Sequence, residues 1–165
     1  QRISIARALV SNPKFIVADE SVAALDVSIQ ADILNLLKQL QNELNLTYLF
    51  ISHDLSVVAH VCDIVAVMYL GHIVEMAPSR KLFSNPRHSY TKALLSSIPS
   101  IDPENKSNAI ELKGEIPSAM NPPSGCVFRT RCPNPTHDCK EGNIGMGLIE
   151  VERDHWVDQC CVNCG

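Results

Sequence analysis

Two adjacent carboxylates, Asp19 and Glu20, directly follow the short apolar run 15–18. Such a run, bounded by polar residues, is typical of a strand buried on both faces of a parallel sheet. Open α/β sheets bind ligands at the carboxyl ends of their strands, and carboxylates there are costly unless they face water or a cation. The pair therefore predicts a site in which Asp19 holds a hydrated cation and Glu20 orients or deprotonates a water molecule. The simpler alternative is a strand followed by an acidic helix cap.

A histidine and a third acid extend this candidate site. His53 follows the β-rich run 47–51. If the two strands are parallel neighbours, His53 opens on the same sheet edge as the acid pair, within reach of one shared ligand. A buried structural histidine is the alternative for His53. Asp26 stands at the start of a helical pattern, where a plain helix cap would account for it.

The elements that must position these residues alternate between strand and helix. Helical periodicity covers 1–10 and resumes after Asp26, and we expect a short helix at 55–62. We expect strands at 15–18, 47–51 and 63–68, and a turn at Gly71 that leads into a short strand at 72–75. Strand–helix–strand order predicts an α/β fold with a mostly parallel sheet. The apolar stripe of the long helix comprises Ile29, Ile33, Leu36, Leu37, Leu40 and Leu44.

In their order and spacing, the segments QRISIARALVSNPK, DE, ALD and FISHD resemble ATP-binding cassette (ABC) ATPases. The resemblance runs essentially end to end and is closest to the ATP-binding subunits of bacterial oligopeptide and dipeptide importers. It implies a P-loop NTPase fold, with Asp19 as the Walker B aspartate for Mg²⁺ and Glu20 as the catalytic glutamate. It makes His53 the switch histidine and places Asp26 in the D-loop, at the interface of two cassettes. Ser21 stands where the family usually has proline, which changes turn stiffness more than chemistry.

The resemblance also implies a function: ATP hydrolysis, with ATP and Mg²⁺, that energises peptide import across the cytoplasmic membrane. The implied partners are a second homologous ATPase subunit in a heterodimer, transmembrane permease subunits and, indirectly, an extracytoplasmic peptide-binding protein. The chain would lie at the cytoplasmic face of the membrane. The sequence holds no GxxxxGK[ST] phosphate loop. We therefore expect 1–85 to be the second half of an ATPase domain, inactive by itself.

Composition limits the alternatives. The chain has 165 residues, 45% of them hydrophobic and 19% charged, as in ordinary globular proteins. Its net charge of −4 argues against a general nucleic-acid surface, and no run approaches the roughly 18 apolar residues of a membrane span. Two other functions remain open: an ABC-type ATPase without a membrane partner, and a metal or redox module on an inactive cassette half. The segment NPRHSYTKALLSSIP favours the importer, because it resembles the tail of that subfamily.

Cysteines mark a second module, which we expect at 86–165. Within it, a polar linker at 100–111 precedes the part that holds the cysteines. Six of the seven cysteines lie beyond position 125, in a region rich in proline and loops that needs covalent or metal staples. Cys126, Cys132, Cys139 and Cys160 are separated by five, six and twenty residues. They resemble the cysteine-bearing tail of the importer ATPases, and four thiolates suit a [4Fe–4S] cluster. Disulfides, which are rare in the cytosol, zinc, which favours closer pairs, and buried thiols are the alternatives.

Overall fold

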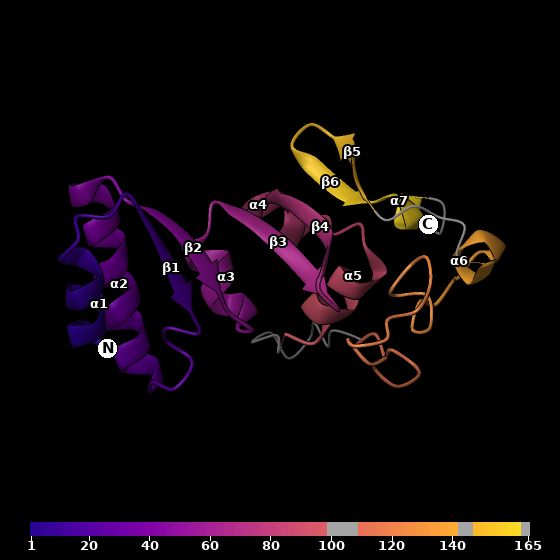
Figure 1. Cartoon of the computed structure of the whole chain (residues 1–165), viewed down its shortest axis with the longest axis horizontal. Coiled ribbons are helices and arrows are strands. Elements are labelled where there is room, and N and C mark those ends of the chain that lie inside the picture. Colours follow the sequence, from indigo (N-terminus) through magenta and orange to yellow (C-terminus); the bar gives the residue numbers. More distant parts are fainter. Residues whose placement is uncertain (99–108, 142–146, 163–165) are drawn as a thin grey trace, which may run out of the picture. The chain divides into compact units, whose positions relative to one another are not determined.

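The computed structural model describes residues 1–98, 109–141 and 147–162 (Figure 1). The chain divides into two compact units, 1–62 and 63–165, and each is described by itself. The functional boundary that we expect between 85 and 86 stays a prediction.

The first unit contains a pair of parallel strands and three helices. Its elements are α1 (Arg2–Leu9), β1 (Phe15–Asp19), α2 (Val27–Leu44), β2 (Thr47–Ile51) and α3 (Leu55–Val61). Strands β1 and β2 pair in parallel from Phe15 opposite Thr47 to Asp19 opposite Ile51, which confirms the predicted strand–helix–strand unit. Asn45 caps the C-terminus of α2 with a left-handed φ of 52°, a conformation that asparagine tolerates at helix ends.

The core of this unit lies on one face of the strand pair. Buried side chains from α2, from α3 and from the loop before α2 pack there against Tyr48 and Phe50 of β2. On the opposite face, Phe15 and Val17 of β1 are 53% and 54% exposed. The expectation of burial on both faces is therefore wrong for the described residues, because helices cover only one face. The core comprises Val22, Ile33, Leu34, Leu37 and Val57.

The predicted stripe on α2 is correct at its centre and wrong at its ends. Ile33 and Leu37 are buried, whereas Ile29 and Leu44 are 47% and 52% exposed. Leu34, which lies outside the predicted stripe, is buried beside them. Periodicity thus identified the inward face of the helix, but not how far along the helix the core extends.

The second unit is built on an antiparallel sheet. Its elements are β3 (Ile64–Tyr69), β4 (His72–Pro78), α4 (Ser79–Ser84), α5 (Ser89–Ser96), α6 (His137–Glu141), β5 (Leu148–Glu152), β6 (His155–Asp158) and α7 (Gln159–Val162). The strand order is β3-β4-β6-β5, and every neighbouring pair is antiparallel. The expectation that 63–68 extends a mostly parallel sheet is therefore wrong. Leu70 and Gly71, with φ of 47° and 81°, form a two-residue turn, and such turns join antiparallel strands.

The C-terminal hairpin β5–β6 was not expected. It joins the β3–β4 hairpin through two residue pairs, Glu75 with Val157 and Met76 with Trp156. Between 109 and 136 the chain forms no helix or strand, which agrees with the predicted loop-rich tail. Residues 100–108 of the predicted linker at 100–111 lie outside the described residues.

Within the described parts of the chain, no helix has the length and apolar character needed to cross a membrane.

Candidate functional site

The ends of the two parallel strands bring Glu20 and His53 together. Asp19 pairs with Ile51 at the last position of the ladder. The Glu20 N–H then donates to the Ile51 carbonyl at 3.0 Å, so the pairing continues one residue past β1. His53 follows two residues after β2, and its Nδ1 lies 2.9 Å from the Glu20 carboxylate. The predicted convergence of these two side chains is confirmed.

The backbone of Glu20 is left-handed, with a φ of 47°. This conformation costs a residue with a side chain about 1–2 kcal/mol, and such strain clusters at functional sites. Two backbone hydrogen bonds hold it: the one to Ile51 and one from the Ala23 N–H to the Glu20 carbonyl at 3.2 Å. The chain therefore turns sharply at Glu20, directly where the carboxylate is needed, and nothing in the residue types indicated this turn.

The Glu20–His53 pair is open to solvent. The His53 side chain is 75% exposed and that of Glu20 is 45% exposed. The hydrogen bond that His53 donates to Glu20, followed by the attraction of the carboxylate charge, raises the pKa of His53 above its ordinary value. The contact therefore favours the imidazolium form of His53. A positive imidazolium next to a carboxylate can donate a hydrogen bond to an anionic ligand while the carboxylate contacts water.

Asp19 lies beside this pair, on the wall of a hollow of about 310 Å³ that also includes Glu20 and Ser21. The rest of the wall is formed by residues of α1 and β1, together with Gln1, Leu37 and Tyr48. Asp19 is exposed and can hold a hydrated cation. Mg²⁺ is usually bound through one or two carboxylates, several waters and substrate phosphates, so a single aspartate at this position fits the ion.

Asp26 is not among the described residues that line this hollow. It occupies the N-cap of α2 with extended backbone, and its side chain makes no capping hydrogen bond. The carboxylate is exposed. The helix-cap alternative is therefore not supported by a hydrogen bond, and the role at a cassette interface stays a prediction.

All four predicted cysteines lie in the second unit, and three of them are buried. Cys126, Cys139 and Cys160 are each at most 2% exposed. The sulfurs of Cys139 and Cys160 are 3.3 Å apart, and a hydrogen bond with Cys160 lowers the pKa of the Cys126 thiol. Cys132 is half-buried. Among the residues that the structure describes, no group of three or more His, Cys, Asp or Glu is arranged to hold a metal ion.

Sequence reasoning missed a buried polar centre in the second unit. Glu75 and His155 are both fully buried, and His155 Nε2 lies 2.7 Å from Glu75 Oε1. The Arg87 and His88 N–H groups donate to the two oxygens of Glu75 at 2.8 and 2.9 Å. This carboxylate thus joins β4, β6 and the entry to α5. A glutamate at an inward position of a strand was the available signal.

Residues 74–139 match the family described as "Oligopeptide/dipeptide transporter, C-terminal region". The putative oligopeptide transport ATP-binding protein YkfD of Bacillus subtilis is 59% identical over 155 residues, which are 93% of this chain and 47% of that protein. AppF, an oligopeptide transport ATP-binding protein of the same organism, is 59% identical over 143 residues, 86% of this chain and 44% of that protein. The dipeptide transport ATP-binding protein DppF of Haemophilus influenzae is 55% identical over 141 residues, 86% of this chain and 43% of that protein. The chain thus spans less than half the length of these relatives.

Proposed function

We propose that this chain is part of the ATP-hydrolysing subunit that energises peptide import, because residues 74–139 match the C-terminal region of oligopeptide/dipeptide transporters. The names of its relatives, which are ATP-binding proteins of oligopeptide and dipeptide transport, support the proposal. The observation that carries it is the 2.9 Å contact between Glu20 and His53 at the ends of two parallel strands. A carboxylate and a histidine at this edge suit the hydrolysis of a phosphate anhydride.

Each residue at the strand ends has a distinct task in this reaction. Hydrolysis of ATP is mostly a matter of positioning and charge stabilisation. Asp19 would hold Mg²⁺ through bound waters, and the ion supplies charge neutralisation at the phosphates. Glu20 orients the attacking water and accepts its proton. His53 is held by Glu20 through Nδ1, which leaves Nε2 to donate a hydrogen bond toward the γ-phosphate.

The partners follow from the same proposal. A second, homologous ATPase subunit would pair with this one in a heterodimer, and Asp26 would lie at their interface. The pair would drive transmembrane permease subunits, which receive peptides from an extracytoplasmic binding protein. The protein would then be peripheral, at the cytoplasmic face of the membrane. The transport names of the relatives favour this function over an ATPase without a membrane partner.

The decisive variant is Glu20→Gln in the complete protein. It should retain ATP binding and lower turnover by about 10²–10⁴-fold, the usual contribution of a general base. His53→Ala should likewise spare binding and slow hydrolysis. Asp32→Asn, which changes an exposed carboxylate on α2, is the control that should leave turnover unchanged. Hydrolysis at the normal rate by Glu20→Gln would refute the assignment of the general base.

We further propose that Cys126, Cys132, Cys139 and Cys160 hold a [4Fe–4S] cluster in the complete protein. The burial of three of these cysteines within one unit supports the proposal. Such clusters are held by four thiolates, and the solvent exposure of the site helps to set their reduction potential. Iron and sulfide measured after purification without oxygen test it. Stoichiometric iron would support the cluster, whereas metal-free protein with four titratable thiols would exclude it.

A further inference from the structure

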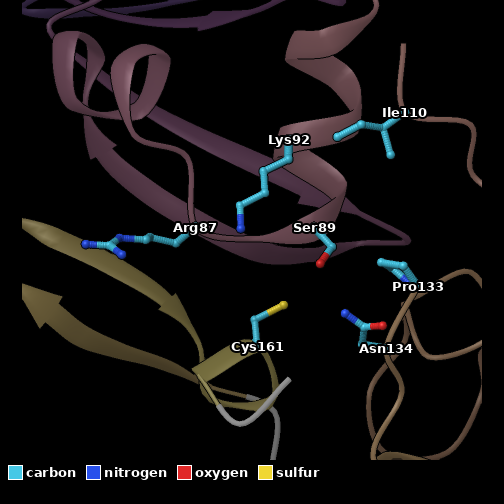
Figure 2. A pocket seen from close by; sticks show the side chains of 7 residues that line it. All are labelled: Arg87, Ser89, Lys92, Ile110, Pro133, Asn134 and Cys161. Carbon is cyan, nitrogen blue, oxygen red and sulfur yellow. The ribbon is translucent and has the colours of Figure 1, made fainter. Parts of the chain in front are cut away.

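The second unit contains a hollow of about 180 Å³ between three segments that are distant in the sequence (Figure 2). The first segment is the start of α5 with the residues before it, the second is the loop region 109–136, and the third is α7. Seven side chains line the hollow: Arg87, Ser89, Lys92, Ile110, Pro133, Asn134 and Cys161. Neither the family match nor the proposed ATPase site accounts for this hollow.

Four of the seven side chains that line this hollow carry N–H or O–H donors. Figure 2 shows the Lys92 side chain extended toward it, with the Ser89 hydroxyl and the Asn134 amide on other sides. No hydrogen bond or salt bridge of these three side chains occurs within the described residues. Among the residues that the structure describes, no carboxylate lines the hollow. The arrangement therefore offers a positive charge and two polar groups without an internal acceptor.

The neighbouring residues Arg87 and His88 do not neutralise the positive charge of Lys92. Figure 2 shows the Arg87 guanidinium directed toward the β5–β6 hairpin, where it pairs with Glu152. Burial, opposed in part by the charge of Glu75, lowers the pKa of the neighbouring His88 to about 4. His88 is therefore neutral at pH 7. Ile110 and Pro133 form apolar walls, and an apolar wall strengthens nearby electrostatic attraction.

We propose that this hollow binds a phosphate group, either as inorganic phosphate or as the monoester of a small metabolite. Lysine binds phosphate as a point charge, and ionised acceptors form the stronger hydrogen bonds. Donors that approach from three directions suit the three acceptor oxygens of a phosphate. A carboxylate has only two oxygens in one plane and cannot meet all three donors equally. A bound phosphate would bridge α5 and the loop that holds Asn134.

Cys161 provides a local reporter of occupancy, because its sulfur faces the hollow in Figure 2. We would measure the rate at which iodoacetamide alkylates Cys161 in the complete protein, by mass spectrometry, with inorganic phosphate, glycerol phosphate or acetate at equal ionic strength. A bound ligand shields the thiol, so phosphate at about ten times its dissociation constant should slow alkylation about tenfold. The readout is independent of phosphate binding at the ATPase site, because it follows one cysteine in the second unit.

Substitutions of Lys92 decide the outcome. Lys92→Gln should abolish protection by phosphate, Lys92→Arg should retain it, and Lys113→Gln, which removes an exposed charge elsewhere in this unit, should leave it intact. Stronger protection by glycerol phosphate would assign a monoester, and stronger protection by inorganic phosphate would assign the free anion. The proposal would be overturned if phosphate protected Cys161 in Lys92→Gln as well as in the unchanged protein. It would also be overturned if acetate protected Cys161 as well as phosphate does, or if millimolar phosphate gave no protection.

Discussion

Glu20 and His53 are 33 residues apart in the sequence, yet their side chains share a hydrogen bond of 2.9 Å at the ends of two neighbouring parallel strands. The Glu20 carboxylate stabilises the imidazolium and so raises the pKa of His53. Because a neutral amide cannot stabilise the cation in this way, Glu20→Gln should bring the pKa of His53 back toward its ordinary value of about 6.5. The measurement is an NMR titration of the imidazole resonances.

The matched control for this titration is Asp26→Asn. Asp26 is not among the groups that shift the pKa of His53, so this variant should titrate like the unchanged protein. A His53 pKa that is the same with glutamate and with glutamine at position 20 would show that the two side chains do not interact in solution.

Ser21 follows the strained Glu20 and has a buried hydroxyl that lacks a hydrogen-bond partner within the described residues. An unsatisfied buried polar group costs about 1–3 kcal/mol. Ser21→Ala should therefore leave the free energy of unfolding unchanged or raise it by up to about 1 kcal/mol, as measured by urea denaturation.

Ser52→Ala is the counterpart to Ser21→Ala. The Ser52 hydroxyl accepts a hydrogen bond from the Asp54 N–H at 3.0 Å. Its loss should lower the free energy of unfolding by about 0.5–1.5 kcal/mol. If Ser21→Ala destabilised the protein more than Ser52→Ala, the Ser21 hydroxyl would have a partner that this structure lacks.

Residue types and spacing were sufficient to predict the strand ends that carry Glu20 and His53. Apolar runs separated by a helical pattern predicted parallel strands, and parallel strands end at the same edge. They could not predict the left-handed φ of Glu20, because glutamate has no preference for it. They also could not predict that Phe15 and Val17 are exposed, since an apolar side chain does not indicate what covers it.

The antiparallel sheet of the second unit was predictable, and the error has a clear cause. Strands at 63–68 and 72–75 leave three residues between them, and a parallel connection needs a dozen or more. Gly71 was correctly expected in a turn, so the hairpin should have been inferred from the connection length. The hairpin β5–β6 is different, because its contact with β4 depends on the buried pair Glu75–His155, whose residues are 80 positions apart.

That buried pair provides a prediction about stability. Glu75 accepts hydrogen bonds from two backbone N–H groups and contacts His155. Glu75→Ala would leave these two buried backbone N–H groups without an acceptor, and each unsatisfied buried polar group costs about 1–3 kcal/mol, so the free energy of unfolding should fall by at least about 2 kcal/mol. Trp156, the single tryptophan, pairs with Met76 between β6 and β4. Its fluorescence reports this pairing during denaturation.

Glu111→Gln is the control for Glu75, because Glu111 is exposed in the same unit. It should change the free energy of unfolding by no more than about 0.5 kcal/mol. Glu75→Gln keeps the size of the side chain but places an NH₂ where an acceptor is needed, so it should also destabilise the protein. An effect of Glu75→Gln as small as that of Glu111→Gln would mean that the buried carboxylate does not hold the sheet together.

His88 should make the protein sensitive to acid. Its side chain is fully buried, and burial, with a further contribution from Lys92, lowers its pKa to about 4 against the opposing charge of Glu75. The unfolded chain binds a proton at His88 below pH about 6.5, whereas the folded protein does not until pH about 4. The contribution of neutral His88 to the free energy of unfolding is thus complete above the pKa of the unfolded state. It is lost as the pH falls from about 6.5 to the folded pKa of about 4, by about 3 kcal/mol in total.

Urea denaturation followed by Trp156 fluorescence between pH 4 and 8 (about the range of the linkage) measures this loss. His88→Asn keeps an acceptor for the Tyr90 N–H, which donates to His88 Nδ1 at 3.1 Å, and removes the titrating group. The free energy of unfolding of this variant should fall less between pH 6.5 and 4. Its loss over this window should be about 3 kcal/mol smaller than that of the unchanged protein. Asp158, whose pKa is raised mainly by burial, titrates in both proteins and cancels in the difference. His137→Asn, which changes an exposed histidine, should keep the full pH dependence. If His88→Asn kept it as well, another group would be responsible for the loss of stability in acid.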